Sequence, residues 1–501
     1  MRLKKKYNLL LSLLLATSLI GCAVGPDYKK PTNEQLNIPA QWHGTLPHNG
    51  SNLQLIDWWK QFNDPTMELL INSALQTNPS IFTAVAQIKQ AQANLSSSRS
   101  FLFPSLTGTG SASTSKNTMN SFSTGTTNSV GGGGDFFTNN GLSNGASGGA
   151  NMSWELDLFG ATRRSIEASE ARYAASKLDW NDAKVSLAAQ VADTYVSLRQ
   201  CQNLLQTYQE ENKSRSATQD ITQLRVKAGF AARTDANQSS GSLLQNTANL
   251  AQQQSVCGQY QNQLVALTGL DYPTLNKHLS ANYGVIPLPE STTINILPAN
   301  IINQRPDVAS AERSLAAANA DLGVAVANRY PQITLTGSIA ANTGSLYSGQ
   351  PTSWSLGPNV SIPLIDGGYL RAQESLSSAK YDAAFANYRS KVINAVNEVE
   401  DALVRINAAN LRVISAESAE QNYQAYFDAF NQKYNLGWAN LLDLETVRVT
   451  LLSSKEVLAT AKLEQVEAWI ALYKAVGGSW ESDNINNVAS VNNQKVDNKN
   501  G

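Results

Sequence analysis

Three thiols and three imidazoles are the side chains of this sequence best suited to covalent or metal chemistry. They are Cys22, Cys201, Cys257, His43, His48 and His278. A thiolate can be acylated, oxidised to a disulfide or bound to a metal, and an imidazole can ligate a metal or transfer a proton. His43 and His48 are five residues apart in a stretch that contains proline and glycine, which is not a ligand spacing on a helix. We interpret His43 and His48 as solvated loop residues and expect no metal site.

Composition and motifs argue against several further classes of function. The glycine run at 131–134 lacks the Lys-Ser/Thr pair that follows in a phosphate-binding loop. The 501 residues carry a formal net charge of −1 and only 15% are charged, which gives no electrostatic basis for binding nucleic acid. We therefore expect a protein that is not an enzyme, needs no cofactor and binds no nucleic acid.

The first cysteine ends an N-terminal segment typical of an exported protein. Arg2 and three lysines precede an apolar stretch over 9–20, which suits a signal-peptide core and is shorter than the roughly 20 residues of a membrane span. Small Gly21 precedes Cys22, a pattern that resembles the bacterial lipoprotein box, in which the cysteine is acylated and becomes the mature N-terminus. Ala23, in place of aspartate, favours the outer membrane. An ordinary secretory signal with an incidental cysteine is the alternative.

Two copies of one pattern occupy most of the chain, at 77–270 and 304–478. Near the middle of each copy, "KAGFAARTD" matches "NLGWANLLD", so that Gly229 corresponds to Gly437. The first copy holds about 20 extra residues in a Gly-, Ser- and Asn-rich stretch within 104–160, which we interpret as a mobile loop. An internal repeat of this kind predicts two similar structural units.

Each copy predicts a proline-initiated helix, a β-hairpin, a long helix, a glycine turn and a second long helix. The stretches 165–228 and 370–436 contain neither proline nor glycine, and their apolar residues recur at intervals of three and four. At 1.5 Å per residue, about 65 helical residues span roughly 100 Å. Helices of this length must pack against neighbours as coiled coils.

The expected hairpins alternate apolar and polar residues. Ile333, Leu335 and Ile339 fall on one face of a strand, and Trp354 and Leu356 do the same on the next. Such one-sided strands suit the wall of a membrane barrel, although a half-buried soluble sheet has the same period. Four strands cannot close a barrel, so we expect several chains to contribute.

Cys201 lies 28 residues before Gly229, and Cys257 lies 28 residues after it. If Gly229 marks the tip of an antiparallel helix pair, the two thiols lie at the same height, and we expect a disulfide. Their counterparts in the second copy are Ala408 and Gln465, so the packing shared by the two copies does not require cysteine. Two buried free thiols are the alternative.

Taken together, these motifs resemble the TolC-like outer membrane factor family, in particular its lipoprotein branch associated with resistance–nodulation–division efflux pumps. The resemblance covers nearly the whole mature chain. It rests on the lipobox, the repeat, "DWWKQFNDP" from Asp57, "RPDV" from Arg305 and the glycine turns followed six residues later by aspartate.

The resemblance implies an α+β membrane protein made of three chains. They would share a 12-stranded β-barrel, with four strands from each chain, continued by a long α-helical coiled-coil barrel. The homotrimer would lie in the outer membrane, extend into the periplasm and meet a periplasmic adaptor protein and an inner-membrane pump. This implies an efflux channel for small toxic compounds. A duct for ATP-driven protein secretion and a periplasmic coiled-coil scaffold are the alternatives.

The resemblance also implies a gate at the helix tips. In the family an aspartate six residues after the second tip glycine forms a carboxylate ring, and here that residue is Asp443. A tyrosine three residues before the glycine, here Tyr434, bonds to the matching aspartate of the first copy, here Asp235. The tip arginine of the family is replaced by Ala439, so we expect Arg233 or another contact to substitute.

These expectations divide the chain into six segments. They are a signal peptide at 1–21, an extended arm and the start of the helical body at 22–76, the first repeat at 77–270, a linker at 271–303, the second repeat at 304–478 and a disordered tail at 479–501.

Overall fold

The computed structural model describes residues 23–36, 59, 62–119, 139–289, 302, 305–344 and 352–478. The expected signal peptide, the lipidation site at Cys22, His43, His48 and the C-terminal tail lie outside the described residues.

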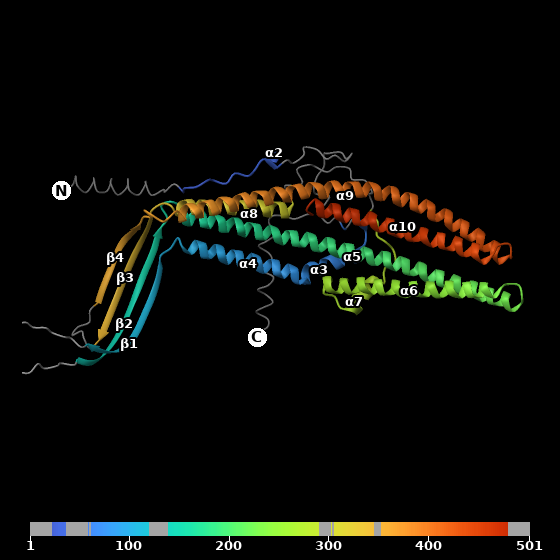
Figure 1. The fold of residues 1–501 in the computed structure, drawn as a ribbon, viewed down its shortest axis with the longest axis horizontal. Coiled ribbons are helices and arrows are strands. Elements are labelled where there is room, and N and C mark those ends of the chain that lie inside the picture. The colour runs from blue at the N-terminus through green and yellow to red at the C-terminus, as the bar shows by residue number, and fades with distance from the viewer. Residues whose placement is uncertain are drawn as a thin grey trace, which may run out of the picture. The chain divides into compact units, whose positions relative to one another are not determined.

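The same order of elements occurs twice along the chain (Figure 1). The first set is α4 (Pro79–Ser100), β1 (Ser105–Met119), β2 (Asn139–Leu156), α5 (Ala161–Lys227) and α6 (Arg233–Thr268). The second set is α8 (Pro306–Ala327), β3 (Gln332–Gly344), β4 (Thr352–Ser361), α9 (Tyr369–Asn435) and α10 (Leu441–Ala475). Both proline-initiated helices and both long helices therefore agree with the sequence prediction.

Among the described residues, three shorter helices stand outside this repeated order, namely α2 (Asn33–Leu36), α3 (Pro65–Thr77) and α7 (Tyr272–Leu279). The segment expected as a linker thus contains a helix. None of the described helices has an apolar stretch long enough to cross a membrane.

The chain divides into two compact units. One contains Ala91–Arg172 and Leu315–Ala383 and holds all four strands. The other contains Tyr173–Ser314 and Ala384–Gly501 and holds both helical hairpin turns.

The four strands form one antiparallel sheet in the order β1-β2-β3-β4. In its register Ile333 lies between Leu156 and Val360, and Gly337 lies between Met152 and Leu356. Residues directly opposite each other share a face of the sheet, so the apolar residues gather on one face as predicted. Leu106, Ile339, Trp354, Leu356 and Val360 are all more than half exposed in the single chain.

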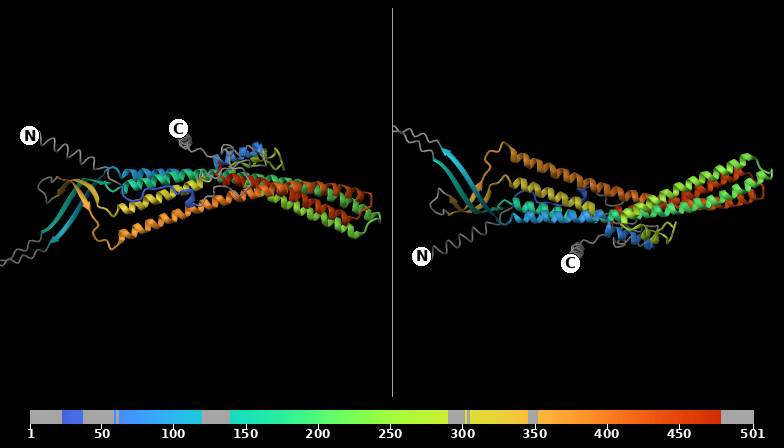
Figure 2. Two further views of the ribbon diagram at one scale, coloured as in Figure 1. Left: turned by 90° about the horizontal axis from the view of Figure 1, so that it is seen from above. Right: turned by 90° about the horizontal axis from the view of Figure 1, so that it is seen from below.

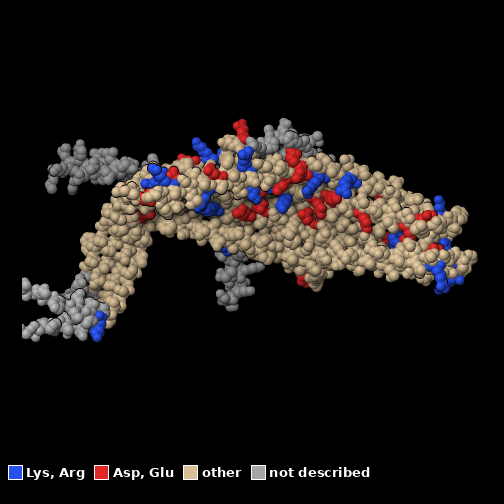
Figure 3. Space-filling model, in the orientation of Figure 1, with Lys and Arg blue, Asp and Glu red and all other residues tan. Residues whose placement is uncertain are grey.

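Seen from the side drawn in Figure 3, the described part of the sheet is almost entirely neutral. One face of the sheet is thus apolar and exposed, and the other carries Ser, Thr and Asn, with Ser338 and Ser355 bonded across it at 2.9 Å.

The insertion of the first repeat is not only a loop, and this expectation was partly wrong. Asn139–Ala150 continues strand β2, pairing with β1 from Met119↔Asn139 onward. The reason is that ladder hydrogen bonds use backbone groups alone, so a Gly- and Ser-rich segment can extend a sheet when neighbouring strands offer partners. Here β1 pairs with the whole segment and β3 pairs with it from Gly145 onward.

The motif "DWWKQFNDP" has a structural role at the start of α3. Asp64 caps this helix by accepting hydrogen bonds from the backbone N–H groups of Thr66 at 2.9 Å and Met67 at 3.2 Å. The other oxygen of Asp64 accepts from the Tyr195 hydroxyl at 2.6 Å. This contact ties α3 to the middle of α5.

The motif "RPDV" fixes the start of α8 in a similar way. The Arg305 guanidinium donates to both oxygens of Asp307 at 3.0 Å, to Glu398 of α9 at 2.6 Å and to the carbonyl of Ala475 at 2.8 Å. One buried arginine therefore joins the beginning of α8 to α9 and to the end of α10.

Candidate functional site

The two helical hairpins end in equivalent glycine turns. Gly229 follows α5 with φ +79°, and Gly437 follows α9 with φ +80°. This left-handed conformation is open to glycine without the penalty that a Cβ atom brings, and it ends a helix. The two hairpins lie side by side in both views of Figure 2. The predicted tips at Gly229 and Gly437 are thus present.

Within the described part of this single chain, Tyr434 and Asp235 do not form the expected bond and have other partners. Tyr434 is only 3% exposed, packs with Leu441 and Leu444, and places its hydroxyl 3.1 Å from the hydroxyl of Thr222 on α5. Asp235 instead accepts from the backbone N–H of Ala232 at 3.4 Å. The carboxylate is engaged at the N-terminus of its own helix, where negative charge is favourable.

Arg225 is the cation that contacts the tip tyrosine. Its guanidinium carbon lies 4.8 Å from the centre of the Tyr434 ring, and its Nη2 donates to the carbonyl of Tyr434 at 3.1 Å. Arg233, the residue suggested by the sequence, is exposed. Arg225 lies in the last turn of α5 but donates to a carbonyl of α9, so no local pattern in the sequence identifies it as the partner of Tyr434.

Asp443 is exposed in the first turn of α10. Its backbone N–H donates to the Asn440 side chain at 2.8 Å, and its carboxylate has no hydrogen-bond or ion-pair partner among the described residues. Thr446, one turn further on, is also exposed and bonds back to the carbonyl of Leu442 at 2.8 Å. The geometry leaves Asp443 available to face solvent, as a ring carboxylate must.

Glu445 points in a different direction from Asp443 and is buried. It contacts Arg215 of α5, Ser242 of α6 and Arg448 of its own helix. This buried group of charges was not predicted from the sequence. The spacings Glu211–Arg215 and Glu445–Arg448 are typical of helix ion pairs, but such pairs usually lie on a solvated face.

Cys201 and Cys257 lie opposite each other on α5 and α6 and form a disulfide in the structure, with their Cα atoms 5.6 Å apart. Both residues are buried. In the second repeat the side chain of Gln465 donates to Asn410 at 2.8 Å. The equivalent level of that hairpin is therefore joined by a hydrogen bond.

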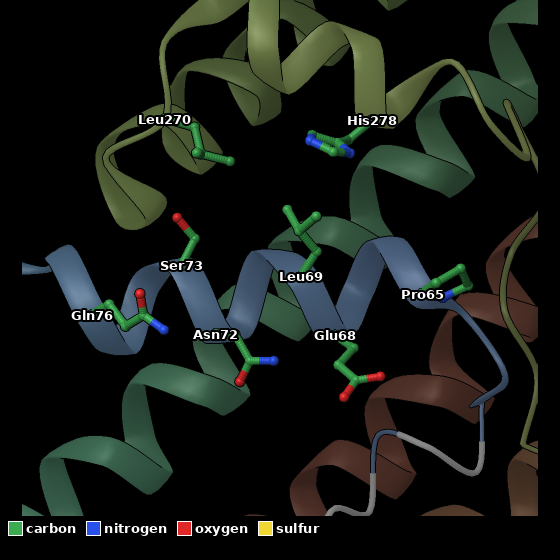
Figure 4. A pocket seen from close by; sticks show the side chains of 8 residues that line it. All are labelled: Pro65, Glu68, Leu69, Asn72, Ser73, Gln76, Leu270 and His278. Carbon is green, nitrogen blue, oxygen red and sulfur yellow. The ribbon is translucent and has the colours of Figure 1, made fainter.

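His278 lines an open groove between α3 and α7 (Figure 4). His278 and Leu270 face Leu69 and Ser73 across the groove. Within the described residues no group of three or more His, Cys, Asp or Glu side chains could hold a metal ion.

Comparison with known proteins decides the family. The family model described as outer membrane efflux protein matches residues 70–270 and 297–478. The chain belongs to the outer membrane efflux protein family. Both parts of the match coincide with the two repeats, and the family agrees with the resemblance noted in the sequence.

Relatives within this family match the chain over almost its full length. Nodulation protein T of Rhizobium leguminosarum bv. trifolii is 30% identical over 488 residues, covering 96% of this chain and 98% of that protein. The probable efflux pump outer membrane protein TtgC of Pseudomonas putida is 28% identical over 500 residues, covering 97% and 99%. The solved structure of the outer-membrane channel OprN has a TM-score of 0.76 at 27% identity, covering 92% and 100%.

Proposed function

We propose that this protein is the outer-membrane channel component of a tripartite efflux system, forming a trimeric duct from the periplasm to the exterior for small toxic compounds. The observation that carries the proposal is a sheet with one exposed apolar face, present together with two long helical hairpins in a chain that the family model matches over both repeats. An apolar outer face suits lipid, and the long hairpins suit the wall of a duct.

The edges of the sheet support a trimer. Within the described sheet, β1 and β4 each pair with one strand only, so each leaves one edge open. An open edge of this length is usually paired or covered. Edge pairing between three chains would give the expected 12 strands, and a periplasmic adaptor and an inner-membrane pump would complete the system.

Deletion of the gene tests the proposed function. We expect the deletion strain to become more susceptible to several drugs, bile salts or metals, and a plasmid copy to restore resistance. Unchanged susceptibility together with loss of a secreted protein would favour the alternative, a duct for ATP-driven protein secretion.

We also propose that Cys22 carries the lipid anchor. The arm that follows it is well bound: Arg164 of α5 pairs with Asp27 at 2.6 Å, and Asn319 of α8 donates to the carbonyl of Pro26 at 2.9 Å. Mass spectrometry of the N-terminal peptide should find an acylated residue 22. We expect Cys22→Ser, exported through an ordinary signal peptide, to lower trimer yield without abolishing conductance, because one lipid chain adds only marginal binding. An unmodified thiol at residue 22 would contradict the assignment.

Replacing Asp443 should change the ion selectivity of the channel. In a trimer three exposed Asp443 carboxylates would form a ring, and rings of acidic side chains favour cations. We expect Asp443→Ala to reduce the cation-to-anion permeability ratio at least about twofold, as measured from reversal potentials in a planar bilayer under a salt gradient. Glu417→Gln is the control, because Glu417 is already paired with Lys462 at 2.9 Å. An unchanged permeability ratio in Asp443→Ala would show that Asp443 does not form a ring that sets ion selectivity.

A further inference from the structure

Four charged side chains are buried together near the helix tips. They are Glu211 and Arg215 of α5 and Glu445 and Arg448 of α10. The Arg448 side chain is 0% exposed, and the other three are at most 9% exposed. Two positive and two negative charges balance within this group, which we call the ion cluster.

The ion cluster connects all four helices of the two hairpins. Arg448 donates to Ser214 at 3.2 Å and to Thr218 at 2.9 Å on α5. Glu445 accepts from Ser242 of α6 at 2.6 Å. The Arg448 guanidinium also lies 5.6 Å from the ring of Phe427 on α9.

The repeat does not require these charges. At the offset that relates Gly229 to Gly437, the four counterparts are uncharged, namely Ala419, Tyr423, Asn237 and Ser240. The packing shared by the two repeats is therefore possible without an ion cluster. The charges lie at the interface between α5 and α10. The equivalent positions on α9 and α6 carry no charge, so the ion cluster distinguishes the first pair of helices from the second.

The ion cluster is held together but is incompletely satisfied. Glu211 Oε2 lies 3.5 Å from Arg215 Nε and 3.8 Å from Arg448 Nε, and all three atoms are buried without a hydrogen-bond partner among the described residues. Burial raises the pKa of the Glu211 carboxyl, against the opposite effect of Arg448 and Arg215. Unpaired buried polar atoms disfavour the packed arrangement. Contacts of this kind can hold two hairpins together and still be released.

We propose that the ion cluster is the lock that holds α10 against the α5–α6 hairpin and keeps the tips of the duct closed, in the role expected of a Tyr434–Asp235 bond. This proposal rests on the proposed function, because release of the lock opens a channel only if the protein forms one. It makes Arg448 the central positioning residue of the lock, because Arg448 contacts α5, α9 and Glu445.

Two variants of the full-length protein test the lock. Arg448→Met keeps most of the apolar stem but leaves an unbalanced buried negative charge, whose burial is strongly unfavourable. The double variant Arg448→Met/Glu445→Gln restores charge balance, and the glutamine can still bond to Arg215 and Ser242. We expect hydrogen exchange at 211–218 and 441–450 to rise about tenfold or more in the single variant, equivalent to about 1.4 kcal/mol, and to recover substantially in the double variant.

Single-channel conductance measures the effect of the same variants on channel opening. We expect Arg448→Met to raise the mean conductance in a planar bilayer and the double variant to lie closer to wild type. Arg412→Met is the matched control, because Arg412 pairs with Glu464 between α9 and α10 but is about half exposed. If Arg448→Met does not assemble, Ser242→Ala removes the contacts of α6 with Glu445 and Arg215 and should raise exchange in the same two segments.

Equal exchange in Arg448→Met and Arg412→Met would overturn the proposal. Exchange in the double variant as fast as in the single variant would also overturn it, because charge balance would then be irrelevant. Failure of the proposed function looks different: wild-type protein would form no conducting pore while the exchange differences remained, and the ion cluster would stand as the contact that holds the hairpins.

Discussion

Replacing Arg199 with methionine is expected to destabilise the helical body by about 3–5 kcal/mol. Arg199 is fully buried in α5 and donates to the carbonyls of Leu279 at 2.9 Å and Ala281 at 2.6 Å. It also donates to Gln202 at 2.9 Å and to the Tyr195 hydroxyl at 2.9 Å. Methionine can fill much of the space but leaves the two carbonyls and the Tyr195 hydroxyl without this donor, whereas Gln202 keeps the backbone N–H of Gly284 at 3.2 Å.

The Arg199 contacts matter because they connect segments far apart in the chain. The Tyr195 hydroxyl in turn donates to Asp64, the cap of α3, and Leu279 is the last residue of α7. The network therefore joins α5 to both α3 and α7. Burial is the main cause that raises the pKa of Tyr195, so its hydroxyl stays protonated and can donate. We expect Arg199→Met to loosen both α3 and α7 from α5.

Chemical denaturation of the purified full-length protein, followed by circular dichroism, measures this effect. Tyr195→Phe should destabilise by a smaller amount, about 1–2 kcal/mol, because it removes one hydroxyl from the same network. Lys462→Met is the surface control, since exposed ion pairs contribute at most about 1 kcal/mol. If the free energies of unfolding of Arg199→Met and Lys462→Met differed by less than about 1 kcal/mol, the Arg199 network would not contribute more to stability than a surface ion pair.

Removing the disulfide is the second change with a large expected effect. Cys201 and Cys257 are separated by 56 residues in sequence, and a loop of this size gives a stabilisation of up to about 4 kcal/mol, through restriction of the unfolded chain. We expect Cys201→Ser/Cys257→Ser to lower the denaturation midpoint by a corresponding amount, without changing the helix content of the folded protein.

Alkylation gives an independent measurement of the disulfide. Denatured protein should show no labelled thiol at residues 201 and 257 before reduction and two labelled thiols after it. Gln465→Ala is the matched variant of the second hairpin, because it removes only the hydrogen bond to Asn410 and should have an effect of about 1 kcal/mol. Two labelled thiols in unreduced protein would show that the pair is not joined in the isolated protein.

The sequence by itself determined the repeat, the long helices, the tip glycines and the alternation of the strands. Each of these depends on local rules. Helical periodicity, the need for glycine at a left-handed turn and the period of two in a strand can all be read within a short window. The placement of Cys201 opposite Cys257 also followed from local geometry, because equal distances from Gly229 fix the height of both residues on an antiparallel helix pair.

Only the tertiary structure decided which side chains meet across the helices. Tyr434 bonds to Thr222 and not to Asp235, and Arg225, not Arg233, lies against its ring. Glu445 turns into the ion cluster, where its partner Arg215 is 230 residues away in sequence. Such contacts depend on the rotation and spacing of packed helices, which the hydrophobic period of one helix does not specify. The same holds for Asn139–Ala150, which became a strand because β1 along its whole length and β3 from Gly145 onward offered backbone partners, although its own residues favour a loop.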